Sequence, residues 1–372
     1  MRYVFTLFAT SCIVLALGAA INGWFDPFGV WRGYEAVTTL PPHMRMKPGI
    51  DADPRFAKPL QVITLKPQTI IVGSSRVRDG MDPGLLTRLA PAPVMNYGVA
   101  GLRAREGARF IRHAIDVAQV KCVVWGLDFF GFNDREMDEM GADGFGVLQS
   151  RPRTQDMARL LLAWPTLSLS GDIIDGKGTT LPNGFNLAPA TPESAIDASI
   201  LRNAVGFAKA PFLYGKFDSY AAHLRDVEAT LDYAARKGVT VYLYTSPLHG
   251  LVMEAIFQAG ADKIFYAWKR DMAALAEKYR MPAVDYMTYN SITTAHGAAA
   301  AELFFDGAHF TPKVSRMILG EWFALETHGP DDFGVRLSPD TVDAQWQRLL
   351  RDRRRYAEDN AHRIQELTAA LR

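Results

Sequence analysis

Short apolar runs that each end at or near a glycine or a turn recur along the chain, and segments of helical periodicity separate them. The runs are candidates for buried strands at residues 69–72, 94–97, 122–125, 239–244 and 283–286. The helical segments cover residues 102–120, 217–237, 265–278 and 312–325. Strands that alternate with helices predict an α/β fold of three layers, in which helices cover both faces of a doubly wound, parallel, five-stranded sheet.

The N-terminus carries an uncharged, mostly apolar run between Arg2 and Asp26. A helix of that length reaches about 35 Å, enough to cross a hydrocarbon core of about 30 Å. We therefore predict a transmembrane anchor over residues 1–25. A cleaved signal peptide with its apolar part at 12–21, or a buried helix of a soluble protein, are the alternatives. Basic residues stand on both sides of the run, so charge alone leaves its orientation open.

The rest of the chain divides by composition. Residues 26–66 are rich in proline and aromatic residues and predict a linker, and 67–327 hold the α/β domain. Within that domain, 134–215 break the alternation and are interpreted as an insertion over the strand ends, either a lid or a substrate cap. Residues 328–372 predict a charged C-terminal helix. Its arginines either touch anionic lipid or polymer or form a solvated face, and we favour the solvated face.

Composition excludes several classes of protein. The 372 residues include 41 Lys and Arg against 40 Asp and Glu, a balance that argues against a general nucleic-acid binder. The two cysteines, Cys12 and Cys122, lie in apolar segments, so neither a disulfide framework nor a cysteine zinc site is expected. No metal motif is found, and the spacing from Gly98 to Gly101 is too short for a dinucleotide fingerprint, so no metal or cofactor is expected.

Three motifs stand where a doubly wound sheet places its site, beyond the carboxyl ends of the strands. Ser75 follows the first strand, where its hydroxyl can act as nucleophile and its N–H as an oxyanion donor. Gly101 follows the second strand and lets a second N–H approach the substrate. Asp306 precedes His309 by three residues, a spacing that suits an acid-oriented general base. Each motif alone is common in turns and helix caps, so the case depends on their combination.

The set resembles the SGNH (GDSL-like) hydrolase superfamily, in particular its membrane-anchored bacterial branch related to polysaccharide O-acetylation proteins. The resemblance covers about residues 66–325. Ser75 matches the block-one nucleophile, Gly101 the block-two oxyanion glycine, and Asp306 and His309 the block-five pair. It implies a flavodoxin-like SGNH fold on a single-pass anchor in a bacterial inner membrane, with the catalytic domain in the periplasm.

The same resemblance implies a serine esterase or O-acyltransferase. Its substrates would be acyl esters, most simply acetyl esters, of a cell-envelope or exported polysaccharide, or a small ester. A polysaccharide-assembly protein is a candidate partner.

Two positions depart from that family's pattern. Ser74 replaces the usual Asp before the nucleophile, and Asp128 occupies the position of the oxyanion-hole Asn. A carboxylate there repels a developing oxyanion unless it is protonated or turned away. Asn133 is a candidate replacement donor. Asp128 leaves open a catalytically inactive scaffold that binds polysaccharide or an assembly partner.

Secondary candidates have two interpretations each. His249 follows the fourth strand and either contacts substrate or is a hydrogen-bonded loop histidine. Arg76 and Asp128 are predicted to bind substrate, whereas the alternative for Arg76 is a salt bridge inside the fold. Asn290 is expected in a turn. A weaker third hypothesis is a phosphate- or nucleotide-binding protein that uses the turn at Gly73 as an anion cradle.

Overall fold

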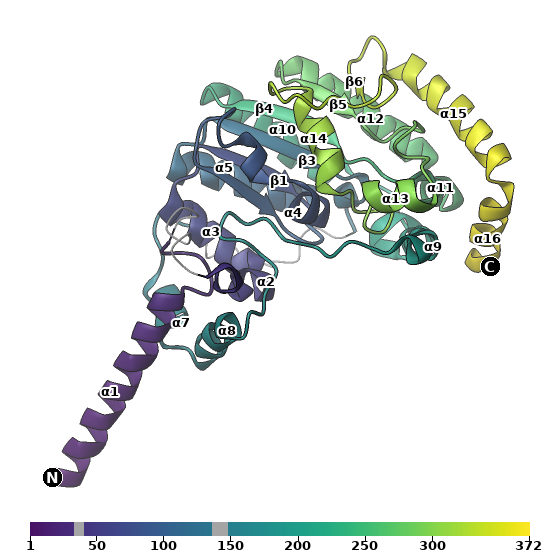
Figure 1. The fold of residues 1–372 in the computed structure, drawn as a ribbon. Helices are drawn as coiled ribbons and strands as arrows, with labels where there is room; N and C mark the ends of the chain where they lie inside the picture. Colours follow the sequence, from purple (N-terminus) through teal and green to yellow (C-terminus); the bar gives the residue numbers. More distant parts are fainter. Residues whose placement is uncertain (33–40, 136–147) are drawn as a thin grey trace.

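The computed structural model describes residues 1–32, 41–135 and 148–372 and has a six-stranded sheet at its centre (Figure 1). The strands are β1 (Thr69–Gly73), β2 (Val94–Gly98), β3 (Cys122–Leu127), β4 (Thr240–Thr245), β5 (Ala283–Asp285) and β6 (Val335–Arg336). Their order across the sheet is β2-β1-β3-β4-β5-β6. β1 to β5 are parallel, whereas β6 pairs antiparallel with β5.

Within the described residues the sheet therefore has six strands, which corrects the predicted five. β6 is a two-residue edge strand that pairs with β5 through Val284 opposite Arg336 and Asp285 opposite Val335. A pairing this short has no hydrophobic period to reveal it in the sequence. It lies in the segment that we predicted as a charged helix.

Helices cover both faces of the sheet. One face carries α5 (Ala104–Ala118), α10 (Ala221–Arg236) and α12 (Asp262–Lys278), and the other carries α4 (Ser75–Gly80) and α14 (Pro312–Gly320). Alternate residues of β1 point to opposite faces of the sheet. Ile70 and Val72 pack in the core under α5, and Ile71 packs in the core under α4 and α14. This arrangement confirms the predicted α/β class with a mostly parallel sheet.

The remaining helices surround this body. They are α2 (Pro48–Ala52), α3 (Pro54–Leu65), α7 (Thr154–Leu162), α8 (Trp164–Ile174), α9 (Glu193–Lys209), α11 (Gly250–Gln258), α13 (Gly297–Leu303), α15 (Val342–Asp359) and α16 (Ala361–Leu371). Short helical turns lie at Pro42–Met44, Pro83–Leu86, Phe129–Phe132 and Pro211–Gly215.

The N-terminal helix α1 (Arg2–Phe25) projects away from the body (Figure 1). It is long and apolar enough to cross a membrane, and none of its most apolar stretch is buried against the protein. The predicted N-terminal apolar helix is thus confirmed. A signal sequence has the same length and composition, so these properties alone do not separate the two.

The segment predicted as a linker contains a helix that belongs to the body. α3 begins after Asp53, whose side chain accepts a hydrogen bond from the N–H of Phe56, and it packs against α5. Two polar residues, Lys58 and Gln61, are fully buried within it. These buried polar residues, together with Pro59 inside the helix, hide the helical period from a sequence reading.

The predicted insertion at 134–215 separates into parts with different neighbours, and its residues 136–147 lie outside the described part of the chain. α7 and α8 pack against α1 at the end of the body from which α1 projects (Figure 1). α9 packs against α11, beside the carboxyl ends of the strands. Among its described residues, α9 and the chain from 179 to 187 therefore approach the place where we expected a lid, whereas α7 and α8 do not.

The C-terminal segment forms two helices rather than one. α15 ends at Asp359, and Asn360 separates it from α16. Arg353 of the arginine cluster turns inward and pairs through two nitrogens with the buried Glu254, while Arg351, Arg354 and Arg355 are exposed.

Candidate active site

Ser75 is the first residue of α4, immediately after the turn that follows β1. A Cβ on Gly73 would lie 2.4 Å from Val77 Cγ2, so only glycine permits helix α4 to pack this close to the strand end. Ser74 caps the helix, because its Oγ accepts a hydrogen bond from the N–H of Arg76 at 3.3 Å. The N–H of Ser75 lies in the first turn of α4 and has no partner within the helix.

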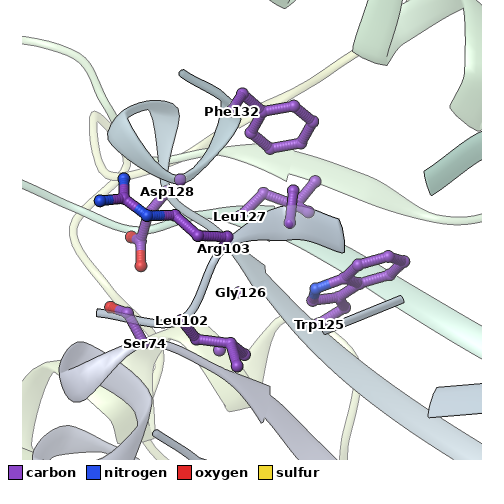
Figure 2. Close-up of a pocket in the computed structure, with 11 residues that line it drawn as sticks. Ser74, Leu102, Arg103, Trp125, Gly126, Leu127, Asp128 and Phe132 are labelled. Carbon is purple, nitrogen blue, oxygen red and sulfur yellow. The ribbon is translucent and has the colours of Figure 1, made fainter. Parts of the chain in front are cut away.

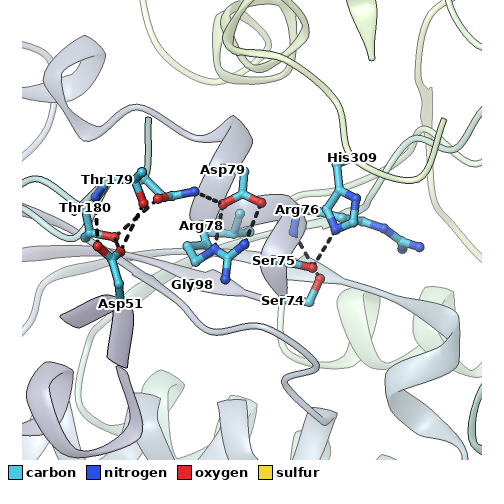
Figure 3. Close-up of polar contacts among 12 residues, drawn as sticks. Asp51, Ser74, Ser75, Arg76, Arg78, Asp79, Gly98, Thr179, Thr180 and His309 are labelled. Carbon is cyan, nitrogen blue, oxygen red and sulfur yellow. Dashed lines mark hydrogen bonds and ion pairs between the residues drawn. The ribbon is translucent and has the colours of Figure 1, made fainter. Parts of the chain in front are cut away.

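Ser75, His309 and Asp306 form a row of hydrogen bonds. Figure 3 shows the contact between Ser75 and His309, which are 234 residues apart in the chain. Ser75 Oγ lies 2.7 Å from His309 Nε2, and His309 Nδ1 lies 2.8 Å from Asp306 Oδ2. A carboxylate partner at Nδ1 selects the Nδ1–H tautomer, which leaves Nε2 as an acceptor for the serine hydroxyl. The side chains of His309 and Asp306 are 25% and 27% exposed, so the row is open to small molecules.

The environment of Asp306 keeps its carboxylate ionised. Burial alone would raise its pKa, but the hydrogen bond and charge of His309, with the N–H groups of His309 and Ala308, outweigh burial and lower the pKa. An ionised carboxylate at this position orients the imidazole and stabilises its protonated form.

The turn from Asp306 to His309 is held by α9 and by the start of α11. Asn203 of α9 donates from Nδ2 to the carbonyl of Asp306 at 2.9 Å. The N–H of His249 donates to the carbonyl of Gly307 at 2.8 Å. Gly307 has φ 78°, and a Cβ there would meet Ile200 Cγ1 at 2.8 Å, so this position requires glycine.

Arg76 and Asp128, both predicted to bind substrate, instead form a buried ion pair. Arg76 Nη1 lies 2.5 Å from Asp128 Oδ1, and their side chains are 1% and 3% exposed. The guanidinium also donates from Nε to the carbonyl of Ala308 at 2.8 Å and lies over the ring of Phe130. This geometry favours the salt-bridge alternative for Arg76, and it ties the third strand end to the turn that carries His309.

The space behind the serine turn is too small for a substrate group. Figure 2 shows residues that line this space, among them Ser74, Asp128 and Arg103. Its volume is about 10 Å³, which is the room for one water molecule. The row is open instead on the side where His309 and Asp306 are partly exposed.

His249, the other predicted substrate contact, is fully buried and bonded to backbone through both ring nitrogens. Nδ1 accepts from the N–H of Leu251 at 3.1 Å, and Nε2 lies 2.9 Å from the carbonyl of Ala295. Burial lowers the pKa of His249 to about 3. It is a neutral cap of α11, which is the loop-histidine alternative.

The two asparagines considered in the sequence have structural hydrogen bonds. Asn133 is buried, and its Nδ2 donates to the carbonyls of Pro211 and Leu213 at 3.1 and 3.0 Å, so it does not replace an oxyanion donor. Asn290 Oδ1 accepts from the N–H of Ile292 and of Thr293, as expected of a turn residue.

Gly101 lies in the turn that follows β2. Gly73 and Gly98 are opposite each other in the sheet, and the N–H of Val99 donates to the carbonyl of Gly73 at 2.9 Å. Gly101 follows within this turn at φ 68°, a left-handed conformation that favours glycine. Its assignment as an oxyanion donor stays a prediction.

A polar cluster beside the row was missed by the sequence analysis. Arg78, three residues after Ser75, pairs with Asp79 at 2.6 and 2.9 Å, and Asn186 Nδ2 donates to Asp79 at 2.7 Å (Figure 3). A cavity of about 140 Å³ lies next to this cluster and is lined by Ile50, Asp51, Pro54, Lys58, Arg78, Thr179, Thr180 and Asn186.

Lys58 at the base of this cavity binds the backbone. Its Nζ donates to the carbonyls of Asn96, Gly98 and Gly184 at 3.1, 2.7 and 3.0 Å, and burial lowers its pKa to about 7. The available sequence signal is a lysine among the mostly apolar residues 56–63, which lie within the segment predicted as a linker.

A larger open hollow of about 510 Å³ lies between the turn after β5 and α15, and its lining includes Asn290, His296 and Tyr356. No residue of the Ser75 row lines it. We therefore centre the candidate site on the row and not on the larger hollow.

Comparison with known proteins adds little to this geometry. No protein-family model matches the chain, and no curated protein matches it. Among solved structures, the chain is similar to a "putative acylhydrolase" from Bacteroides fragilis, with 12% identity and a TM-score of 0.32 over 68% of this chain and 85% of that one. This similarity is too low to carry an argument, so the functional assignment below depends on the site itself.

Proposed function

We propose that the protein is a membrane-anchored serine esterase or O-acyltransferase with an SGNH-like, flavodoxin-like domain in the bacterial periplasm. Its substrates would be acyl esters, most simply acetyl esters, of a cell-envelope or exported polysaccharide. The observation that carries the proposal is the row in which Ser75 Oγ, the His309 imidazole and the Asp306 carboxylate are joined by bonds of 2.7 and 2.8 Å. The apolar helix α1 supports the anchor.

The row supplies each proton transfer of acyl transfer. His309 Nε2 takes the proton of Ser75 as Oγ bonds to the ester carbonyl carbon. The protonated imidazole, stabilised by Asp306, then gives that proton to the alcohol oxygen as the carbon–oxygen bond breaks. Water or a sugar hydroxyl attacks the acyl-serine, its proton passes through His309 back to Ser75, and the enzyme returns to its starting state.

The oxyanion would be held by the N–H groups of Ser75 and Gly101. Asp128 supplies no donor in this scheme. Its pairing with Arg76 places a positive charge beside the carboxylate, which reduces the repulsion that an unpaired Asp128 would exert on an oxyanion.

A fluorophosphonate probe tests the nucleophile directly, because it forms a covalent bond with an activated serine. We expect the full-length protein to be labelled at Ser75 and the Ser75→Ala variant to be unlabelled. Ser74→Ala is the matched control: Ser74 is 1% exposed and caps α4, so its loss costs about 1 kcal/mol of stability and leaves labelling intact.

Equal labelling of wild type and Ser75→Ala would reject the nucleophile, and a silent wild type would favour the inactive scaffold. With labelling established, acetyl-ester turnover with and without an added sugar acceptor separates the two reactions. An esterase releases acetate at a rate that the acceptor does not change, whereas a transferase places the acetyl group on the sugar.

A further inference from the structure

The inner end of α1 is bonded to the body and is not a free tether. Asn22 is 1% exposed, although it lies in an apolar helix. Its Nδ2 donates to the carbonyl of Leu161 at 2.9 Å, and Ser170 Oγ donates to its Oδ1 at 2.9 Å. These two bonds join α1 to the end of α7 and to the middle of α8.

The length of α1 brings this junction to the membrane. Nearly all side chains from residue 2 to residue 17 are exposed, and the covered positions begin at Gly18. The uncovered part therefore measures about 24 Å at 1.5 Å per residue, less than the roughly 30 Å of a hydrocarbon core. If α1 spans a bilayer, the turns that pack against α7 and α8 must lie at the edge of the lipid.

The surface of α7 and α8 has the composition that such a position requires. Leu162, Trp164 and Ile174 are 50%, 78% and 54% exposed. Outside α1, they are the three most exposed large apolar side chains among the residues that the structure describes. Trp24 of α1 is 60% exposed, and the guanidinium of Arg32 lies 4.6 Å from its ring centre. Tryptophan and arginine together are typical of a membrane–water interface.

We propose that α7 and α8 form a membrane-docking hairpin whose Leu162, Trp164 and Ile174 enter the lipid interface beside the end of α1. The occupant of this apolar surface is the phospholipid bilayer itself, because the surface continues that of α1. The proposal rests on the anchor in the proposed function. It gives the body two attachments, and it therefore sets the orientation of the sheet relative to the membrane.

The hairpin is also linked to the candidate site through the chain that follows α8. The N–H of Thr179 donates to Asp51 at 2.8 Å, and Asn186 reaches Asp79 beside Arg78 (Figure 3). Docking of the hairpin would thus hold Ser75 at a defined height above the lipid.

Site-directed fluorescence of the full chain in phosphatidylcholine–phosphatidylglycerol vesicles tests the proposal. In a Cys12→Ser background, Trp164→Cys carries a polarity-sensitive dye, and nitroxide-labelled lipid is the quencher; Cys122 is buried and does not compete. Gln347→Cys, at an exposed position on α15 far from α1, is the matched control. The wild-type protein, labelled with the same dye at its native Cys12, shows whether α1 lies in the bilayer.

We expect the dye at position 164 to emit at shorter wavelength and to be quenched several-fold more than the dye at position 347. Equal emission and quenching at the two positions, with Cys12 quenched, would overturn docking and leave the anchor intact. An unquenched Cys12 would overturn the anchor and docking together. Fluorophosphonate labelling of Ser75 does not depend on either outcome, so failure of the catalytic proposal is distinguishable.

Discussion

Ser75 and Arg76 are neighbours at the start of α4, and both reach the turn from 306 to 309, yet their surroundings differ. Ser75 contacts His309 in a row whose imidazole and carboxylate are about one quarter exposed. Arg76 contacts Ala308 from within a pair with Asp128 that is almost fully buried. A reacting group must be reachable by its substrate, whereas a buried ion pair maintains the architecture around it.

The two clusters therefore make opposite predictions. Substitutions in the row of Ser75, His309 and Asp306 should remove activity without lowering stability. Substitutions in the buried pair of Arg76 and Asp128 should lower the stability of the fold.

The largest effect is expected from Asp306→Asn. The amide presents no negative charge to Nδ1 of His309 and favours the wrong tautomer, so kcat for acetyl-ester turnover should fall by about 10⁴-fold. The asparagine oxygen still accepts from the N–H groups of Ala308 and His309, so the thermal midpoint should stay close to that of the wild type. Activity within tenfold of the wild type would remove Asp306 from the mechanism.

Asp128→Asn should cause the largest loss of stability. It leaves the guanidinium of Arg76 buried without a counter-charge, which costs about 3–5 kcal/mol of unfolding free energy in urea denaturation. The double variant Arg76→Met with Asp128→Leu removes both charges and should recover much of that loss. A single variant as stable as the wild type would mean that the pair has no structural role.

Acid should lower the stability of the fold through the buried side chain of His249. Its pKa is about 3 in the folded protein and 6.5 in the unfolded chain, so only the unfolded state takes up a proton between these values. Unfolding free energy therefore falls as pH drops below 6.5, by about 2 kcal/mol at pH 5, and this contribution is constant above 6.5.

His249→Asn, which keeps a capping oxygen, is the control for this prediction, because it lacks the titrating ring. The stability difference between wild type and variant should shrink between pH 7.5 and pH 5. A difference that is independent of pH would contradict the assignment of a neutral, buried imidazole.

The smallest effect is expected from Asn203, which bonds to the turn that carries Asp306 and His309. Asn203→Ala removes one hydrogen bond to the carbonyl of Asp306, so it should cost about 1 kcal/mol of stability. A looser turn should also lower kcat severalfold without changing the pH dependence. A loss as large as that of Asp306→Asn would place Asn203 in contact with substrate.

The sequence by itself determined the features that depend on local patterns. Apolar runs marked β1 to β5, because strands buried on both faces need continuous apolar residues, and α1 was evident from its length without charge. The positions of Ser75, Gly101 and Asp306 at strand ends and turns also followed from local order along the chain.

Only the tertiary structure decided which polar residues are buried and with whom they pair. Arg76 meets Asp128 52 residues away, Lys58 binds carbonyls as far along the chain as Gly184, and Asn22 meets α7 and α8. The burial and the partner of each polar side chain depend on segments that come together only on folding. A local sequence pattern therefore cannot predict them. For the same reason, the sequence predicted that Arg76 and Asp128 bind substrate, whereas in the fold they form one buried ion pair.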